Sequence, residues 1–365
     1  MDVDAGCRAP RPADAPRTVV VSHPYASDAG DSPIYEVLQL SAAGALHSTG
    51  VTFAMRAADE GVIAFTPDGR LGFAAQRDGT VGVFSVGDDG GVQVVNPALG
   101  GFYARAVVMA PDGSRAYVLD AETLNNGGGV YAVDIACDGT LGTPTKLGTF
   151  NTPSAMAFLH GAPNQAVVAG GAALGSPAGD DTHLVDFSAP GPTAIGSAAL
   201  FPDGGAIASD VAVTPDDAYA LVADNGLFAG NRVGVVRLGG ASPSLVDILP
   251  TANPVGVVSS PFGNAALVLN SDGMDGLTLL SYDPTQAAHP FTNAGALTYV
   301  LPKPQLPSEA VVIQRGGLIG RVLIGELLGV RQVQFLADGG ALDLSVHNPD
   351  GDDLADIVGA MGVQP

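Results

Sequence analysis

Six polar side chains directly follow short apolar segments at intervals of about 45–55 residues, a spacing typical of repeat architectures. A second polar set stands near the start of other apolar segments. If the two sets meet at one end of the fold, they form a carboxylate-rich funnel that contains one arginine and one histidine. The first set is His23, Gln76, Asp120, Asp224, Asn270 and Glu326, with Gly170 at the seventh position, and the second is Glu60, Arg105, Asp210, Glu309 and Asp356.

These side chains suit attack on an ester or a lactone. His23 would act as a base, Arg105 would hold an oxyanion or a substrate carboxylate, and Glu309 or Glu326 would supply the further carboxylate. The remaining members of the funnel would contact the ligand. An alternative interpretation is that polar residues line the solvated mouth of any channel because backbone groups there need partners.

The composition of the funnel also favours a cation site, because carboxylate and amide oxygens are the ligands that Ca²⁺ prefers. A divalent ion there would act as a Lewis acid on a carbonyl group. The oxygen donors in question are Asp120, Asp224, Asn270 and Glu326.

A second candidate calcium site lies near the C-terminus. Asn348, Asp350, Asp352 and Asp356 stand at relative positions 1, 3, 5 and 9 of one segment, and Gly351 stands at position 4. Alternate residues of a tight loop converge on one point, where clustered carboxylates repel each other unless a cation joins them. The alternative is an acidic, solvated turn that precedes a strand.

The elements that must position these residues form an internal repeat. The segment 62–69, with its Pro-Asp-Gly turn, recurs at 107–113 and 211–217, and weaker copies occur at 156–160, 257–263 and 311–317. Each copy predicts an apolar strand, a turn whose proline presets φ, and a second apolar strand. A third alternating strand and a weaker outer strand follow. Four antiparallel strands per repeat indicate the blade of a β-propeller.

The two ends of the chain predict how the ring closes. Residues 18–22 match a second strand, so the first blade lacks its innermost strand, and residues 356–365 match that missing strand. Joining them leaves no open sheet edge. We therefore predict an all-β, seven-bladed propeller of four-stranded antiparallel blades over residues 18–365, after a disordered or tethered linker over residues 1–17.

The runs that carry the repeat, such as Gly79-Thr-Val-Gly-Val-Phe-Ser-Val86, resemble those of the lactonase-like propeller family that includes bacterial phosphogluconolactonases and YVTN-repeat surface proteins. The C-terminal segment is similar to the short calcium loops of integrin-type propeller repeats, with Asn348 where those loops usually begin with Asp. The resemblance implies a lactonase-like hydrolase that opens a lactone or ester at the upper mouth of the central channel, meaning the end at which the first strand of each blade begins. The competing hypothesis is a non-catalytic, extracytoplasmic propeller that binds a ligand or a protein.

Composition excludes several classes of partner. The chain has 15 Lys and Arg against 37 Asp and Glu, a net charge of −22, which disfavours nucleic acids and anionic lipids. No apolar run is long enough to span a membrane, and no nucleotide, haem or flavin fingerprint is present. We expect a monomer that binds a small molecule, with Ca²⁺ as the candidate cofactor.

The N-terminal residues and the two cysteines bear on location. Residues 1–17 are polar and rich in Pro and Ala, without the apolar core of a signal peptide. We interpret them as the linker that follows a removed signal, which predicts an extracytoplasmic protein. Cys7 and Cys137 either form one disulfide that pins this segment or remain as two thiols.

Overall fold

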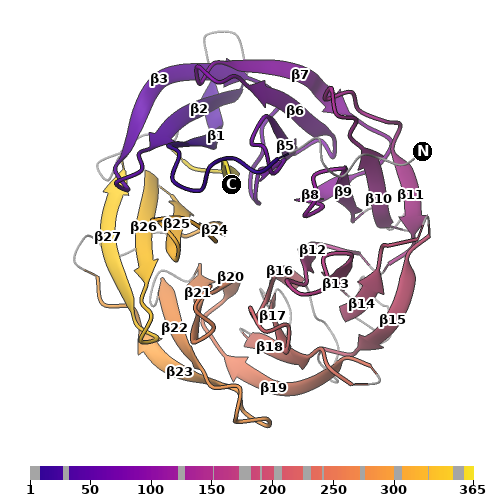
Figure 1. The fold of residues 1–365 in the computed structure, drawn as a ribbon, viewed down its shortest axis with the longest axis vertical. Helices are drawn as coiled ribbons and strands as arrows, with labels where there is room; N and C mark the ends of the chain where they lie inside the picture. The colour runs from indigo at the N-terminus through magenta and orange to yellow at the C-terminus, as the bar shows by residue number, and fades with distance from the viewer. Residues whose placement is uncertain are drawn as a thin grey trace.

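Seven four-stranded antiparallel sheets surround a central axis in the computed structural model (Figure 1). The structure describes residues 9–27, 33–121, 128–150, 152–171, 182–189, 191–200, 208–224, 232–240, 242–271, 276–299, 306–327, 329–347 and 357–365. Within these ranges no helix is long and apolar enough to cross a membrane. The predicted seven-bladed propeller is confirmed.

The blades are numbered here in chain order, with the strands of each given from the inside outward. Blade 1 holds β28 (Met361–Val363), β1 (Arg17–Ser27), β2 (Pro33–Leu40) and β3 (Leu46–Ala54); blade 2 holds β4 (Ala64–Phe65), β5 (Leu71–Ala75), β6 (Val81–Val86) and β7 (Val92–Leu99). Blade 3 holds β8 (Ala104–Met109), β9 (Arg115–Asp120), β10 (Gly129–Asp134) and β11 (Thr145–Gly148); blade 4 holds β12 (Ala155–Phe158), β13 (Gln165–Ala169), β14 (Thr182–Asp186) and β15 (Thr193–Ala198). Blade 5 holds β16 (Ala208–Val213), β17 (Tyr219–Asp224), β18 (Arg232–Arg237) and β19 (Ser244–Pro250); blade 6 holds β20 (Pro254–Ser259), β21 (Ala265–Asn270), β22 (Leu277–Tyr282) and β23 (Phe291–Ala296). Blade 7 holds β24 (Ala310–Val312), β25 (Arg321–Glu326), β26 (Gly329–Phe335) and β27 (Ala341–His347).

The turn between the first two strands of a blade follows from its sequence. In blade 2 the Thr66 hydroxyl donates to Asp68 Oδ1 at 2.6 Å, and the Leu71 amide donates to the Thr66 hydroxyl at 3.1 Å. Gly69 adopts a φ of +69°, which a glycine reaches without strain. We call the face that carries these turns the lower face and the opposite one the upper face.

The hydrophobic core lies between neighbouring blades rather than within one sheet. The second strands β17 and β21 are buried at every position, whereas the outer strand β23 is exposed at all positions after Phe291. One apolar cluster joins Leu221 and Val235 of blade 5 to Val257 and Val268 of blade 6. Because each blade buries both faces of its inner strands against neighbours, the ring must be complete to be stable.

The C-terminal strand completes blade 1, as predicted. Val19 pairs with Val363 and Val21 with Met361 in the β1–β28 register. The buried Gln364 side chain accepts a hydrogen bond from the Thr18 amide at 3.0 Å and donates to the Gly69 carbonyl oxygen at 2.7 Å. The penultimate residue therefore links blade 1 to the turn of blade 2.

The segment before β1 lies against two blade turns. The Arg11 amide donates to the Pro67 carbonyl oxygen at 3.3 Å, and Asp14 Oδ1 accepts from the Gly317 amide at 2.7 Å. Cys137, in the β10–β11 connection, is disulfide-bonded. The only other cysteine of the sequence is Cys7, which lies outside the described residues.

Removing the closing strand should open the ring. A chain that ends at residue 356 is expected to lose about 5 kcal/mol or more of unfolding free energy, because Val358, Met361 and Val363 are each buried and each contributes about 1.5–3 kcal/mol. The milder change Gln364→Ala should cost about 1–3 kcal/mol through the donors and acceptors it leaves unpaired. Urea unfolding measures both, and an unchanged midpoint for either variant would contradict this view of the closure.

Candidate functional site

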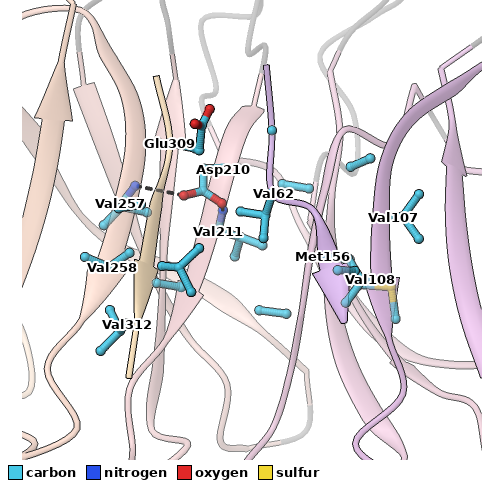
Figure 2. A pocket seen from close by; sticks show the side chains of 18 of the residues that line it. Val62, Val107, Val108, Met156, Asp210, Val211, Val257, Val258, Glu309 and Val312 are labelled. Atoms are coloured by element: carbon cyan, nitrogen blue, oxygen red, sulfur yellow. Dashed lines mark hydrogen bonds between the residues drawn. The ribbon is translucent and has the colours of Figure 1, made fainter. Parts of the chain in front are cut away.

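The inner strands of all seven blades enclose a central channel with a volume of about 510 Å³, within the usual range for small-molecule sites. Most of its wall is apolar, and four charged side chains lie where the inner strands begin, at the upper end. Figure 2 shows two of them, Asp210 and Glu309, above Val258, Val312 and Met156. The four charged residues are Glu60, Arg105, Asp210 and Glu309.

Asp210 is fixed by a β-bulge in β16. The register between β16 and β17 shifts between Ala208 and Asp210, and such a bulge re-aims a side chain. Asp210 Oδ1 accepts from the Val211 amide at 2.8 Å, and Oδ2 accepts from the Val257 amide of blade 6 at 2.9 Å (Figure 2). Burial among protein atoms raises the pKa of Asp210 to about 6, although both hydrogen bonds favour the charged form. The carboxyl group is therefore mostly ionised at neutral pH and can still accept a proton.

Glu309 is the more deeply buried of the two acids, with an exposed fraction of 4%. Neither of its carboxyl oxygens accepts a well-formed hydrogen bond. Burial raises its pKa well above the usual range; the nearby Ser308 hydroxyl and Gly61 amide offset this only in part, and the charge of Glu60 adds to it. A side chain at Gly325 would collide with Glu309 Oε1, so the glycine provides the space in which the carboxyl group lies.

Both acids occupy the same position of the repeat. In every blade one amide near the end of the inner strand donates to the carbonyl oxygen at the start of the second strand; Thr214 does so in blade 5 and Ile313 in blade 7. Asp210 and Glu309 each precede that residue by four positions. The equivalent residues of the other blades are Val62, Ala106, Ala155, Gly256 and Ala360. Two carboxyl groups thus replace small or apolar side chains, which the fold itself does not require.

Arg105 and Glu60 form an ion pair at the upper mouth of the channel. Arg105 lies at a second bulge, between Ala104 and Ala106 of β8, and its side chain is 38% exposed. The guanidinium group is therefore accessible to a ligand in the channel, but its charge is shared with Glu60.

The predicted ring of polar residues after the second strands is placed elsewhere, and we correct its position. These side chains are buried inside their blades and none of them lines the channel, because a residue at the end of a second strand lies one strand away from the axis. Each contacts its own blade instead. Arg232 Nε donates to Asp224 at 3.1 Å, Asn270 donates to the Thr278 hydroxyl at 2.9 Å, and Arg331 pairs with Glu326. The members are Gln76, Asp120, Asp224, Asn270 and Glu326.

His23 also lies away from the channel. Its Nε2 is 3.3 Å from Glu36 Oε2, and its Nδ1 is 3.3 Å from the carbonyl oxygen of Ile357. Burial alone would raise the pKa of Glu36, but hydrogen bonds from His23 and Ser48 lower it. Of the three predicted catalytic residues, Arg105 and Glu309 therefore lie on the wall of the same channel, whereas His23 lies in blade 1 away from it.

The repeat pattern placed Asp210 among several channel residues and contained no signal for the apolar wall. The signal that could have identified Asp210 and Glu309 is their shared position in the repeat, which an alignment of the inner strands by their turns reveals. His160 lines the lower part of the channel. There the Asp217 carboxylate, in the turn of blade 5, accepts hydrogen bonds from the amides of His160 and Gly161.

Among the residues that the structure describes, no three His, Cys, Asp or Glu side chains lie close enough to hold one metal ion. The predicted calcium loop, with Asn348, Asp350, Asp352 and Asp356, lies outside the described residues.

Solved structures share this fold over nearly the full length of the chain. A proposed 6-phosphogluconolactonase from Bacteroides fragilis matches with a TM-score of 0.65 at 14% identity, covering 97% of this chain and 99% of that one. A periplasmic gluconolactonase from Pseudomonas aeruginosa matches with a TM-score of 0.64 at 13% identity, covering 92% and 96%. A proposed 6-phosphogluconolactonase from Bacteroides uniformis matches with a TM-score of 0.68 at 13% identity, covering 95% and 99%. No protein-family profile matches the sequence, and no curated protein matches it significantly.

Proposed function

We propose that this lactonase-like propeller hydrolyses a lactone or an ester at the upper end of its central channel. One observation carries the proposal: two carboxyl groups with raised pKa values stand at one repeat position where the other blades have small or apolar residues. Pairs of acids whose environments move their pKa values apart are typical of acid–base catalysis. The fold of the gluconolactonase and the proposed phosphogluconolactonases adds support by analogy.

The two acids take different roles in this mechanism. Ionised Asp210 removes a proton from a water molecule, whose oxygen attacks the carbonyl carbon and forms a tetrahedral oxyanion. Arg105 stabilises that negative charge, with Glu60 holding the guanidinium group in place. Protonated Glu309 donates its proton to the ring or ester oxygen as the carbon–oxygen bond breaks; a lactone then leaves as a hydroxy acid, and an ester as an acid and an alcohol. Exchange with solvent returns both carboxyl groups to their starting states.

A hydrolysis assay with Asp210→Asn tests the proposal. Acid release from a panel of lactones and aryl esters is followed by titration at constant pH, and the variant should lower kcat by about 10²–10⁴-fold. Asp88→Asn, in an exposed loop, is the matched control and should keep full activity. Equal rates for the wild type and Asp210→Asn would refute the assignment of the base.

A second candidate function is binding without turnover. The apolar wall below the acids favours it, because such a wall holds a ligand without any reaction. Saturable binding of a lactone that is never hydrolysed would favour this alternative.

The same proposal includes an extracytoplasmic, monomeric protein. The disulfide at Cys137 supports that location, because disulfides persist in oxidising compartments.

We also propose that the segment 348–356 binds calcium, on the spacing of its oxygen donors. A fall in melting temperature with EDTA, reversed by added Ca²⁺, is the expected result.

A further inference from the structure

Below the two acids the side chains of the channel wall are mainly apolar until the lower end, where Ser259, Gln314 and His160 also line it. Val108, Met156, Val258 and Val312 contribute aliphatic or thioether surface to the lining (Figure 2). A ligand that enters past Asp210 and Glu309 therefore first meets mainly apolar side chains. Hydroxyl groups buried there would lose their hydrogen bonds to water without replacement, which is costly.

Three serines of the lining already use their protons in bonds between blades. The Ser154 hydroxyl donates to the carbonyl oxygen of Ala208, and the Ser209 hydroxyl donates to that of Pro254 at 3.1 Å. The Ser308 hydroxyl lies 3.4 Å from the carbonyl oxygen of Gly325 in its own blade and 3.5 Å from that of Gly359. Their role in the described structure is to tie neighbouring inner strands together, so they are poor hydrogen-bond donors for a polyol.

The charges of the channel disfavour an anionic ligand. Arg105 is the only arginine in the described lining, which contains no lysine, and Glu60 pairs with it. Ionised Asp210 adds a negative charge at the same end. A phosphate group needs cationic or multiple N–H partners, and the described lining does not supply them.

We propose that the substrate is an uncharged lactone with an aliphatic side chain, held with its ring at the acids and its alkyl chain along the valine- and methionine-lined wall. This inference rests on the proposed function and adds the substrate class. The proposed substrate class differs from the sugar lactones that appear in the names of the structures with the same fold.

The first experiment measures binding and hydrolysis separately. Binding uses γ-alkyl lactams, which have the same shape but are not hydrolysed, with side chains from ethyl to octyl, in a calorimeter. Affinity should rise about fourfold for each methylene group that enters the channel. Hydrolysis uses the matching γ-alkyl lactones and D-glucono-δ-lactone, and kcat/KM should follow the same order, with the sugar lactone the poorest substrate.

Two substitutions at Val312 test where the alkyl chain lies. Val312→Phe should reduce the ratio of octyl to ethyl kcat/KM by about tenfold or more, because added bulk shortens the space. Val312→Thr keeps the volume and adds a hydroxyl group, so it should weaken octyl lactam binding without blocking the channel. Val94→Phe on the exposed face of β7 is the matched control, and melting temperatures confirm that all variants fold.

The outcomes separate the inference from the function on which it rests. Lactams that bind more tightly with chain length, without hydrolysis of any lactone, would support the ligand class and refute catalysis. Hydrolysis that prefers the sugar lactone, or that ignores chain length, would support catalysis and overturn the ligand class. Unchanged chain-length preference in both Val312 variants would also overturn it.

Discussion

Glu309→Gln should reduce kcat for lactone hydrolysis by about 10²–10⁴-fold while leaving the protein at least as stable as the wild type. Glutamine has nearly the same shape but no acidic proton to give to the departing oxygen. The wild-type carboxyl group is buried without a well-formed hydrogen bond, so its removal relieves a cost that grows when the group ionises. Loss of activity together with retained stability is the signature of a functional acid.

The pH dependence of the wild type gives an independent check. Activity should rise as the pH passes about 6, where Asp210 loses its proton, and should fall at higher pH as Glu309 ionises. Stability should behave differently. Both acids have raised pKa values, so the native protein binds more protons than the unfolded chain, and the unfolding free energy decreases as the pH rises above their ordinary values.

Glu309→Gln should flatten part of that decrease, and urea unfolding at several pH values measures it. Asp210 lowers the unfolding free energy as the pH rises from 3.8 to about 6. The decrease due to Glu309 begins near pH 4.5 and extends to higher pH. A Glu309→Gln variant with wild-type kcat would remove Glu309 from the mechanism. An unaltered stability profile would show instead that the carboxyl group is not buried in solution.

The second large effect is expected at Arg331, and it concerns stability. Arg331 is 1% exposed and donates through Nη1 to both oxygens of Asp343 at 2.8 Å, while its Nε donates to Glu326. The Tyr299 ring lies over the guanidinium group at 5.5 Å. Arg331→Leu leaves two carboxylates buried without their cation and should cost about 3–5 kcal/mol of unfolding free energy.

Two further variants show whether the cost comes from the unpaired charges. The triple change Arg331→Leu, Glu326→Leu and Asp343→Leu should recover most of the loss, because removing all the charges together is often neutral or stabilising. Arg77→Leu is the matched control; its ion pair with Asp59 is about half exposed, and its loss should cost less than about 1 kcal/mol. A cost for Arg331→Leu no larger than that of Arg77→Leu would contradict the burial of the cluster.

The fate of Glu326 illustrates what a repeat pattern can and cannot predict. Its place after an apolar segment located it correctly at the end of a second strand, β25. The same pattern could not reveal that Arg331, on the third strand, pairs inside the blade with Glu326 and also with Asp343 of the fourth strand. Strand order depends on local periodicity, whereas the direction of a buried polar side chain depends on which partner the folded sheet brings within reach.

The sequence by itself determined the number of blades and the closure of the ring. Repeated Pro-Asp-Gly turns and alternating apolar residues are local signals, and the match of residues 356–365 to a first strand identified the partner of β1. It also included Arg105, Asp210 and Glu309 among the candidate residues. Only the tertiary structure decided that Asp210 and Glu309 face the channel while His23 and the buried ring do not. The reason is physical: burial and the amide donors of neighbouring blades set the pKa of a carboxyl group, and those surroundings exist only when the seven blades close around one axis.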